Sequence, residues 1–257
     1  MPQLEKFGFT FDKGGAHIAR TMMYDELAEV LSVVDFDSPS RADFANAIED
    51  HNCLGKRSGK ARQLTTRHLV SLYGLDSSVT LFRLLLYFWR RDPDGRPLLA
   101  LLIAYSRDAV LRLSAPLVLN SAEGAVIPRE TTEAYIDKDD PGRFSSATLK
   151  SVAQNVNGTW TKSGHLTGHV KKVRTKAKAT PGAVALALTL GYLVGARGEG
   201  LLVTEYMKLL DCSKDRAIEL AEEASRRGWI VFKRIGDVME VQFPALLTAQ
   251  DMEWLRE

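Results

Sequence analysis

Cysteine is scarce in this chain, and its two cysteines lack the spacing of a metal site or a disulfide pair. Cys53 and Cys212 lie far apart, and neither belongs to a CxxC motif. Disulfide-dependent secreted domains carry several cysteines, and structural zinc sites need four ligands in closely spaced pairs. The sequence therefore argues against a disulfide framework and against a zinc site. It is typical of a protein that stays in the reducing cytoplasm.

Long apolar runs are also missing. A membrane-spanning helix needs about 20 consecutive apolar residues. The two most apolar stretches are 84–105, which the charged turn at 90–95 interrupts, and 183–194. The opening residues 1–11 lack the basic start and apolar centre of a secretory signal. We therefore expect buried helices at both stretches, a cytoplasmic location and no membrane association.

Acidic residues are absent between Arg143 and Gly198, although the whole chain has 34 Lys and Arg against 32 Asp and Glu. Lysine and arginine that cluster without acids attract phosphates, because their binding releases condensed counterions. This pattern indicates a polyanionic ligand, with a solvated charged face as the alternative. The cations of the segment are Lys150, Lys162, Lys171, Lys172, Arg174, Lys176, Lys178 and Arg197.

A second basic segment lies in the first half of the chain. Between His51 and Arg91 the only acid is Asp76. Glycines at 55 and 59 alternate there with a group of cations. This flexible entry to a helix can hold phosphates or can be a mobile loop. The cations of the group are Lys56, Arg57, Lys60 and Arg62.

The apolar periodicity predicts a mainly α protein in two parts. Apolar residues recur at helical spacing through residues 1–120, which predicts an N-terminal helical bundle. Pro116 is expected to end the last helix of this bundle. Residues 121–144 are rich in turn signals and predict a linker with a short helix at 129–136. Residues 145–257 form the expected C-terminal domain.

The C-terminal part has the order of elements of a winged helix-turn-helix. A helix capped by Ser145 or Ser146 precedes a small hairpin at 165–174, whose outer strand is basic. Three further helices and a hairpin at 229–243, with its turn at 235–237, complete the pattern. We therefore predict winged-helix elements with short β-hairpins.

The charges of the helix at 213–228 argue against base reading. Its outward cations alternate with carboxylates, which phosphates would repel. Lys233 and Arg234, at the tip of the last hairpin, can still touch a DNA backbone. The predicted contacts in the second half are Lys150, Lys162, His165, His169, Lys171, Lys172, Arg174, Lys176, Lys178, Lys233 and Arg234, and the group 56–62 adds Lys56, Arg57, Lys60 and Arg62. Backbone contacts would predominate over sequence readout.

No set of residues predicts a reaction, a metal or a cofactor. The glycine-rich stretch 195–200 follows a predicted helix and lacks the lysine and hydroxyl residue of a phosphate-binding nucleotide loop. His165 and His169 have no cysteine or carboxylate close in sequence that would complete a metal site. We therefore expect a protein that is not an enzyme and that uses neither a cofactor nor a metal.

Several short motifs and their order resemble the BrxA family of BREX bacteriophage-defence systems. The resemblance rests on FTFDKGG at residues 9–15, FSSATLK at 144–150, GHL at 164–166 and TPGAV at 180–184. It spans most of the chain, and none of these motifs is a catalytic signature. Residues 120–140 look like an insertion relative to a compact member of that family.

The resemblance implies a non-enzymatic bacterial protein of two helical parts, the first similar to the NusB antitermination fold. It also implies a basic surface that binds double-stranded DNA, in agreement with the acid-free segment. The alternative is an assembly adaptor that holds other BREX proteins or binds RNA, since a NusB-like bundle suits RNA. No aromatic platform of the RRM type supports RNA binding.

Overall fold

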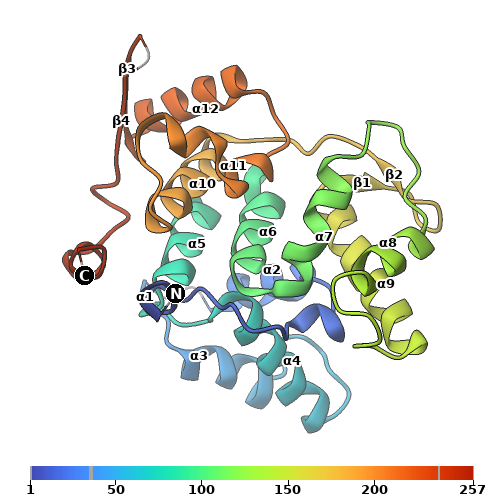
Figure 1. Ribbon diagram of the computed structural model, residues 1–257. Coiled ribbons are helices and arrows are strands. Elements are labelled where there is room, and N and C mark those ends of the chain that lie inside the picture. The colour runs from blue at the N-terminus through green and yellow to red at the C-terminus, as the bar shows by residue number, and fades with distance from the viewer. Residues whose placement is uncertain (1, 35–36, 237, 257) are drawn as a thin grey trace.

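Helices dominate the molecule, and two small antiparallel hairpins complete it (Figure 1). The computed structural model describes residues 2–34, 37–236 and 238–256. The prediction of a mainly α fold is confirmed. Within the described residues, no helix combines the length and the apolar character that crossing a bilayer requires.

The first half is a set of helices joined by short connections. Ser40 and Asp43 form a capping box at the start of α3, and Ser58 caps α4, which ends at Gly74 with φ of 89°. The helices are α1 Pro2–Lys6, α2 Tyr24–Val33, α3 Arg41–Ala45, α4 Gly59–Tyr73, α5 Thr80–Arg91, α6 Arg96–Arg107 and α7 Ala109–Leu119.

Pro116 lies inside α7, so the prediction that it ends a helix is wrong. A proline removes only one backbone donor, and here it stands within the last turn. The turn closes behind it, because the Asn120 N–H donates to the Pro116 carbonyl at 3.1 Å. Ala115 and Val118 are buried and hold the end of the helix against the core.

The second half alternates helices with hairpins. Ser145, Thr180 and Ser213 cap α9, α10 and α12 through their hydroxyls, so of the two predicted caps of α9 it is Ser145 and not Ser146 that caps the helix. The elements are α8 Arg129–Asp137, α9 Ser146–Lys162, β1 Leu166–Thr167, β2 Val173–Arg174, α10 Pro181–Leu193, the 3-10 helix η4 Gly198–Val203, α11 Glu205–Lys208, α12 Lys214–Arg226, β3 Val231–Ile235, β4 Val238–Gln242 and α13 Ala249–Trp254.

Helix α10 lies between α12 and α5 (Figure 1) and contacts both halves of the chain. It packs against α5 and α6 of the first half and against α11 and α12 of the second. Nearly every residue of α10 is buried, which explains why its sequence is apolar on all faces. Apolar residues of both halves join one core cluster. The division of the chain into domains at 120 and 145 stays a prediction.

The first hairpin is shorter than the sequence suggested. β1 pairs with β2 only from Leu166↔Arg174 to Thr167↔Val173, so residues 168–172 form a loop and not a basic strand. Residues 124–127 run along the other edge of β2. The Ile127 N–H donates to the Lys172 carbonyl at 2.9 Å, and the Arg174 N–H donates to the Ala125 carbonyl at 2.8 Å. The expected linker therefore helps to build this small sheet.

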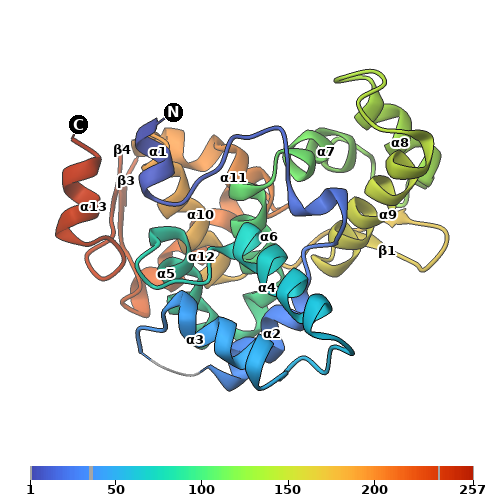
Figure 2. The ribbon, with the colours of Figure 1, turned by 90° about the horizontal axis from the view of Figure 1, so that it is seen from below.

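The second hairpin extends away from the helices (Figure 1). β3 and β4 pair from Val231↔Gln242 to Ile235↔Val238. Asp237, the third residue of the expected turn, lies outside the described residues. Figure 2 shows α13 beside this hairpin and close to α1. There Phe7 meets Trp254 edge to face at 5.5 Å between ring centroids, which joins the two ends of the chain.

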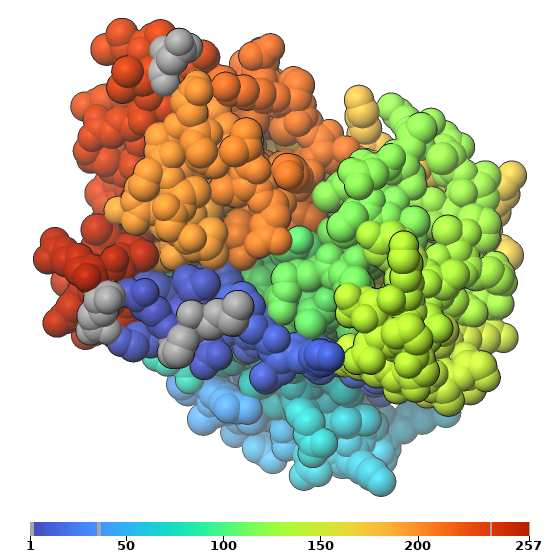
Figure 3. All heavy atoms as spheres, viewed as in Figure 1, coloured from blue at the N-terminus to red at the C-terminus, as the bar shows by residue number. Residues whose placement is uncertain are grey.

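The N-terminal segment also contacts the second half on the surface. It crosses the face shown in Figure 3 and meets the loop after α8, coloured yellow-green. Lys13 pairs with Asp140 at 3.3 Å, and the Arg143 guanidinium donates to the Lys13 carbonyl.

Candidate nucleic-acid interface

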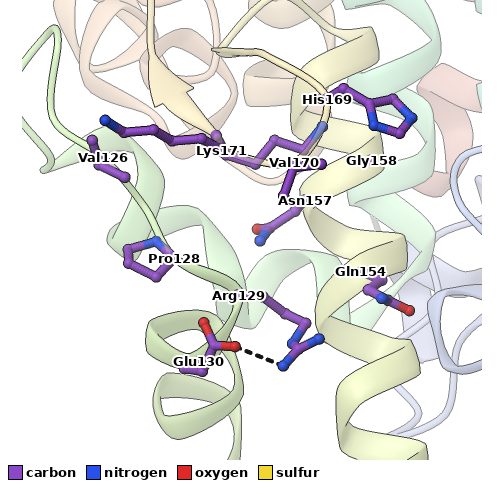
Figure 4. A pocket seen from close by; sticks show the side chains of 11 residues that line it. Val126, Pro128, Arg129, Glu130, Gln154, Asn157, Gly158, His169, Val170 and Lys171 are labelled. Atoms are coloured by element: carbon purple, nitrogen blue, oxygen red, sulfur yellow. Dashed lines mark hydrogen bonds and ion pairs between the residues drawn. The ribbon is translucent and has the colours of Figure 1, made fainter.

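The loop 168–172 and helix α9 enclose a cavity of about 500 Å³ (Figure 4). The strand-like residues 126–128 and the start of α8 form its opposite wall. Its volume falls in the range of about 300–1,000 Å³ that ligand sites occupy. The residues around it are Val126, Pro128, Arg129, Glu130, Gln154, Asn157, Gly158, His169, Val170, Lys171 and Lys172.

Gly168 sets the shape of this loop. Its φ is +92°, and a Cβ there would lie 2.1 Å from the Lys171 carbonyl oxygen. The Lys172 ammonium closes the loop by donating to the Gly168 carbonyl at 2.7 Å. Burial lowers the pKa of Lys172. The loop thus turns sharply and leaves Val170 91% exposed at its tip, beside exposed His169 and Lys171.

The floor of the cavity is polar. Asn157 is only 3% exposed, and its Oδ1 accepts a hydrogen bond from the Thr132 hydroxyl at 3.1 Å. The amide nitrogen at the other end faces the cavity (Figure 4), where no described residue pairs with it; it is not among the fully enclosed polar atoms, so water or a ligand in the cavity can reach it. Arg129 is neutralised, because it pairs with Glu130 and Glu133, both at 2.6 Å.

Several of the cations expected to bind DNA are exposed. Arg57, Lys60, Lys150 and Lys171 have no acidic partner within 4.0 Å among the described residues. Arg62 is half-buried, and its Nε has no hydrogen-bond acceptor there. Helix α9 contains no Asp or Glu along its whole length, and neither does the loop 168–172. This part of the surface keeps the positive charge that the sequence indicated.

Other cations of the acid-free segment meet acids from distant parts of the chain. A segment that lacks acids in the sequence can therefore still have acids beside it in the folded protein. The paired cations are less available to phosphates. The pairs are Lys162 with Asp25 at 2.7 Å, Lys178 with Asp94 at 3.1 Å and Lys176 with Glu123 at 3.9 Å. In the first half, Lys56 pairs with Glu26 at 3.1 Å.

His165 is a core residue, which corrects its place among the expected DNA contacts. It is fully buried, and its ring meets Trp160 edge to face. Nδ1 lies 2.9 Å from the Ser163 hydroxyl, and Nε2 lies 2.9 Å from the Leu209 carbonyl. Burial lowers the pKa of His165 to about 4. A neutral ring with both nitrogens satisfied cannot reach a phosphate.

Arg174 needs the same correction. It is 4% exposed, and its Nε donates to the Val118 carbonyl at 2.8 Å. Its two terminal nitrogens bind both carboxylate oxygens of Asp211. This guanidinium ties β2 to α7 and to the turn before α12, so it is not available to DNA.

The first turn of α2 brings the two basic segments together. Asp25 holds Lys162 at the end of α9, and Glu26 holds Lys56 in the segment before α4. No local sequence pattern indicated this contact, because the partners lie far apart along the chain.

Two further exposed arginines, Arg20 and Arg67, lie near these segments, although neither is among the predicted DNA contacts. The charges of Arg20 and Arg67 add to burial, the larger effect, in lowering the pKa of His68, so both arginines lie close to that ring. Gly158 on α9 borders the cavity and also faces Thr21, the neighbour of Arg20. Arg20 stands alone in its sequence segment, so no local pattern could have revealed it.

The β3–β4 hairpin carries a separate pair of cations. Lys233 and Arg234 are exposed on an arm that Figure 1 shows well away from the loop 168–172. Beside them, Ile235 is 85% exposed and Val238 is 75% exposed.

The charges of α12 are largely paired. Arg216 binds Glu219 at 2.7 Å, Arg227 binds Glu223, and Lys214 binds Glu199 at 3.3 Å. This helix therefore has little net positive field to offer a phosphate, in keeping with the doubt that its sequence raised about base reading.

One chain of polar residues resembles a catalytic triad but is closed to solvent. His17 Nδ1 lies 2.9 Å from the Asp108 carboxylate, and Nε2 lies 2.8 Å from the Thr159 hydroxyl. All three are at most 1% exposed, and the Thr159 hydroxyl also accepts the Met22 N–H at 2.8 Å. The arrangement joins η1 (Ala16–Ile18), α7 and α9, and no substrate can reach it.

A second cavity of about 750 Å³ lies between α7 and α11. Tyr105 on its wall donates to Glu205 at 2.8 Å, and burial, then the Glu205 charge, raises the pKa of this phenol. Burial likewise raises the pKa of the Cys212 thiol, which makes it a poor nucleophile. The described residues contain no cluster of three or more His, Cys, Asp or Glu placed to hold a metal ion.

The chain matches no protein-family model, and no curated protein matches it in sequence. Its own residues therefore carry the functional argument.

Proposed function

We propose that the protein binds double-stranded DNA through the phosphate backbone, with the loop 168–172 and the exposed face of α9 as the main contact. The observation that carries this proposal is the exposed Lys171 beside Lys172 and His169, on a loop and a helix without a single carboxylate. Unpaired cations gain most from counterion release, because no acid competes with the phosphate.

The exposed part of the group 56–62 extends this surface. The first turn of α2 places that group near the end of α9, and Arg57 and Lys60 are exposed there. Lys233 and Arg234 act as a further contact on the β3–β4 arm, as the wing of a winged helix does. Since the charges of α12 are paired, contacts with the backbone predominate and sequence readout is weak.

The biological setting follows from the resemblance to the BrxA family. In this proposal the protein is a non-enzymatic, cytoplasmic component of a BREX-type bacteriophage-defence system. Its first half is the NusB-like part and its second half the winged-helix part. It brings DNA to the other BREX proteins.

A second candidate function is an assembly adaptor within the same system. Exposed Ile235 and Val238 favour it, because paired apolar side chains on a projecting hairpin suit a protein contact. In this reading the basic loop docks on an acidic partner or on RNA.

Fluorescence anisotropy across a salt series distinguishes these functions. The probes are two duplex DNAs of unrelated sequence and a matched RNA duplex. Wild type should bind both DNAs alike, with affinity that falls steeply as salt rises. The double variant Lys171→Glu, Lys172→Glu should weaken both by more than tenfold and lower the salt slope by about 2.

The control variant Lys208→Glu, Lys214→Glu carries the same charge change on α11 and α12. It should alter DNA affinity by less than about twofold, since both side chains lie outside the proposed surface. Salt-insensitive binding, or equal losses in the two double variants, would remove the loop as the contact. Binding to RNA alone would favour the adaptor.

A further inference from the structure

The cavity beneath the loop 168–172 has a feature that phosphate-backbone binding does not use. Asn157 is almost fully buried at its floor, and only one end of its amide has a partner. An amide nitrogen that opens into a cavity hydrogen-bonds either to water or to a ligand that displaces the water. This end faces the cavity (Figure 4), which indicates a ligand with a hydrogen-bonding edge.

The walls differ in character from the floor. Val126, Pro128 and Val170 present apolar surface, and two of them are unusually exposed, with Val126 at 43% and Val170 at 91%. Apolar walls around the buried Asn157 amide match the faces and the edge of a nucleobase, and the exposed Gln154 amide borders the same cavity. Asparagine amides hydrogen-bond to base edges, and apolar side chains pack on base faces.

The rim of the cavity is cationic. Lys171 and Lys172 stand at its mouth with His169, while Arg129 below them is paired with Glu130 and Glu133. A phosphate attached to a bound base would therefore meet the lysines and not the paired arginine. Apolar walls, a polar floor and a cationic rim occur together in this cavity.

We propose that this cavity binds a single nucleotide whose base is unpaired, with the base edge on Asn157 and the phosphate on Lys171 and Lys172. A base within an intact duplex cannot enter without being extruded, and extrusion costs least where the base has no partner. The nucleotide comes from DNA, a source that rests on the proposed DNA binding, or from the free nucleotide pool. In both cases the cavity would bind the same two groups, a base and the phosphate attached to it.

Three probes separate the sources. The first is free dAMP, titrated by calorimetry. The second is a sealed DNA dumbbell, which is fully paired and has no ends. The third is the same dumbbell with one unpaired adenosine. Wild type should bind dAMP and should bind the unpaired dumbbell at least tenfold more tightly than the paired one.

Two variants change the cavity at different places, one at its floor and one at its rim. Asn157→Asp keeps the size of the side chain and the acceptor for Thr132, but it removes the amide donor and places a carboxylate at the floor. Val126→Trp fills the cavity from its exposed rim without changing the core. Each should abolish dAMP binding and bring the two dumbbells within about twofold of each other. Binding of the paired dumbbell should stay within about threefold of wild type.

Asn120→Asp, the same charge change on an exposed residue at the end of α7, is the control and should retain the preference. A wild type that binds neither dAMP nor the unpaired dumbbell preferentially would overturn the proposal. So would a preference that survives in both variants. If wild type binds dAMP but neither dumbbell, the DNA-binding proposal fails and the cavity remains a site for free nucleotides.

Discussion

Arg174 and Asp211 form a bidentate ion pair in which both N···O distances are 2.7 Å. The guanidinium is 4% exposed and the carboxylate side chain 13% exposed. Parallel hydrogen bonds of this kind fix geometry as well as charge. The pair joins the small sheet beside α9 to the turn before α12, so it holds the proposed DNA-binding loop in relation to the rest of the second half.

Breaking this pair should destabilise the fold without removing a side chain that contacts DNA, so the main effect should be on stability and not on DNA affinity. Arg174→Gln leaves Asp211 with an uncompensated charge, and the free energy of unfolding should fall by about 3–5 kcal/mol. Urea titration followed by circular dichroism measures it. Lys176→Gln is the control, because its exposed pair with Glu123 spans 3.9 Å and contributes less than about 1 kcal/mol. If Arg174→Gln instead lost DNA affinity without a change in stability, Arg174 would have to contact DNA directly.

Stability should depend on pH through His165. Burial lowers the pKa of His165 to about 4, against about 6.5 in the unfolded chain. Between these two pKa values, His165 is protonated in the unfolded chain and neutral in the folded protein. The free energy of unfolding should therefore fall as the pH drops from about 6.5 to 4, by about 3 kcal/mol, and this effect should level off below 4.

The measurement is urea unfolding at several pH values between 4 and 7. His165→Gln lowers stability at pH 7 but should remove this part of the pH dependence, because glutamine does not titrate. His51→Gln changes an exposed histidine and should leave the dependence as it is in wild type. An identical pH profile in wild type and His165→Gln would show that other groups carry it.

Removing an acid beside the proposed surface should strengthen DNA binding. Asp25 pairs with Lys162 at 2.7 Å, and Asp25→Asn would free that lysine for a phosphate. Affinity for duplex DNA should rise about two- to fivefold at low salt, and the gain should shrink as salt rises. Anisotropy titrations measure it, with Asp215→Asn on α12 as the matched control. Equal gains in both variants would reflect net charge alone.

Gly168 tests whether the shape of the loop matters. Gly168→Ala forces a Cβ to within 2.1 Å of the Lys171 carbonyl oxygen at a φ of +92°, so the loop must move. Gly124→Ala imposes similar strain at a φ of +82° but meets no atom within 4 Å. The positive φ alone should cost each variant about 1–2 kcal/mol of stability, and the clash should add to this cost in Gly168→Ala. Only Gly168→Ala should weaken DNA binding, by about fivefold or more in anisotropy titrations. Equal DNA affinity in the two variants would contradict a role for loop geometry.

Local signals predicted most of the helices because caps and apolar periodicity act over a few residues. Ser145, one of the two predicted caps, caps α9, and Gly164 follows the end of α9 with φ of +86°. The prediction that Pro116 ends a helix was wrong because the effect of a proline depends on its position within the helix. The hairpin at 165–174 was placed correctly, but its outer strand is shorter than predicted.

The candidate site was only partly foreseen, because charge neutralisation is a tertiary property. Lys162 and Lys178 meet Asp25 and Asp94, acids far away in the sequence. The burial of His165 depends on the Leu209 carbonyl, which no local pattern brings near. Asn157 on the polar face of α9 gave no distinct signal, since its importance comes from residues 126–130 on the facing wall.

The position of α10 has a consequence for how the molecule unfolds. Its faces are covered by α5 and α6 on one side and by α11 and α12 on the other. Separating the halves would expose apolar surface on every one of these helices, at about 25 cal/mol for each Å². The chain should therefore melt in one cooperative transition. A ligand held near α9 would then protect amide protons from exchange as far away as α5.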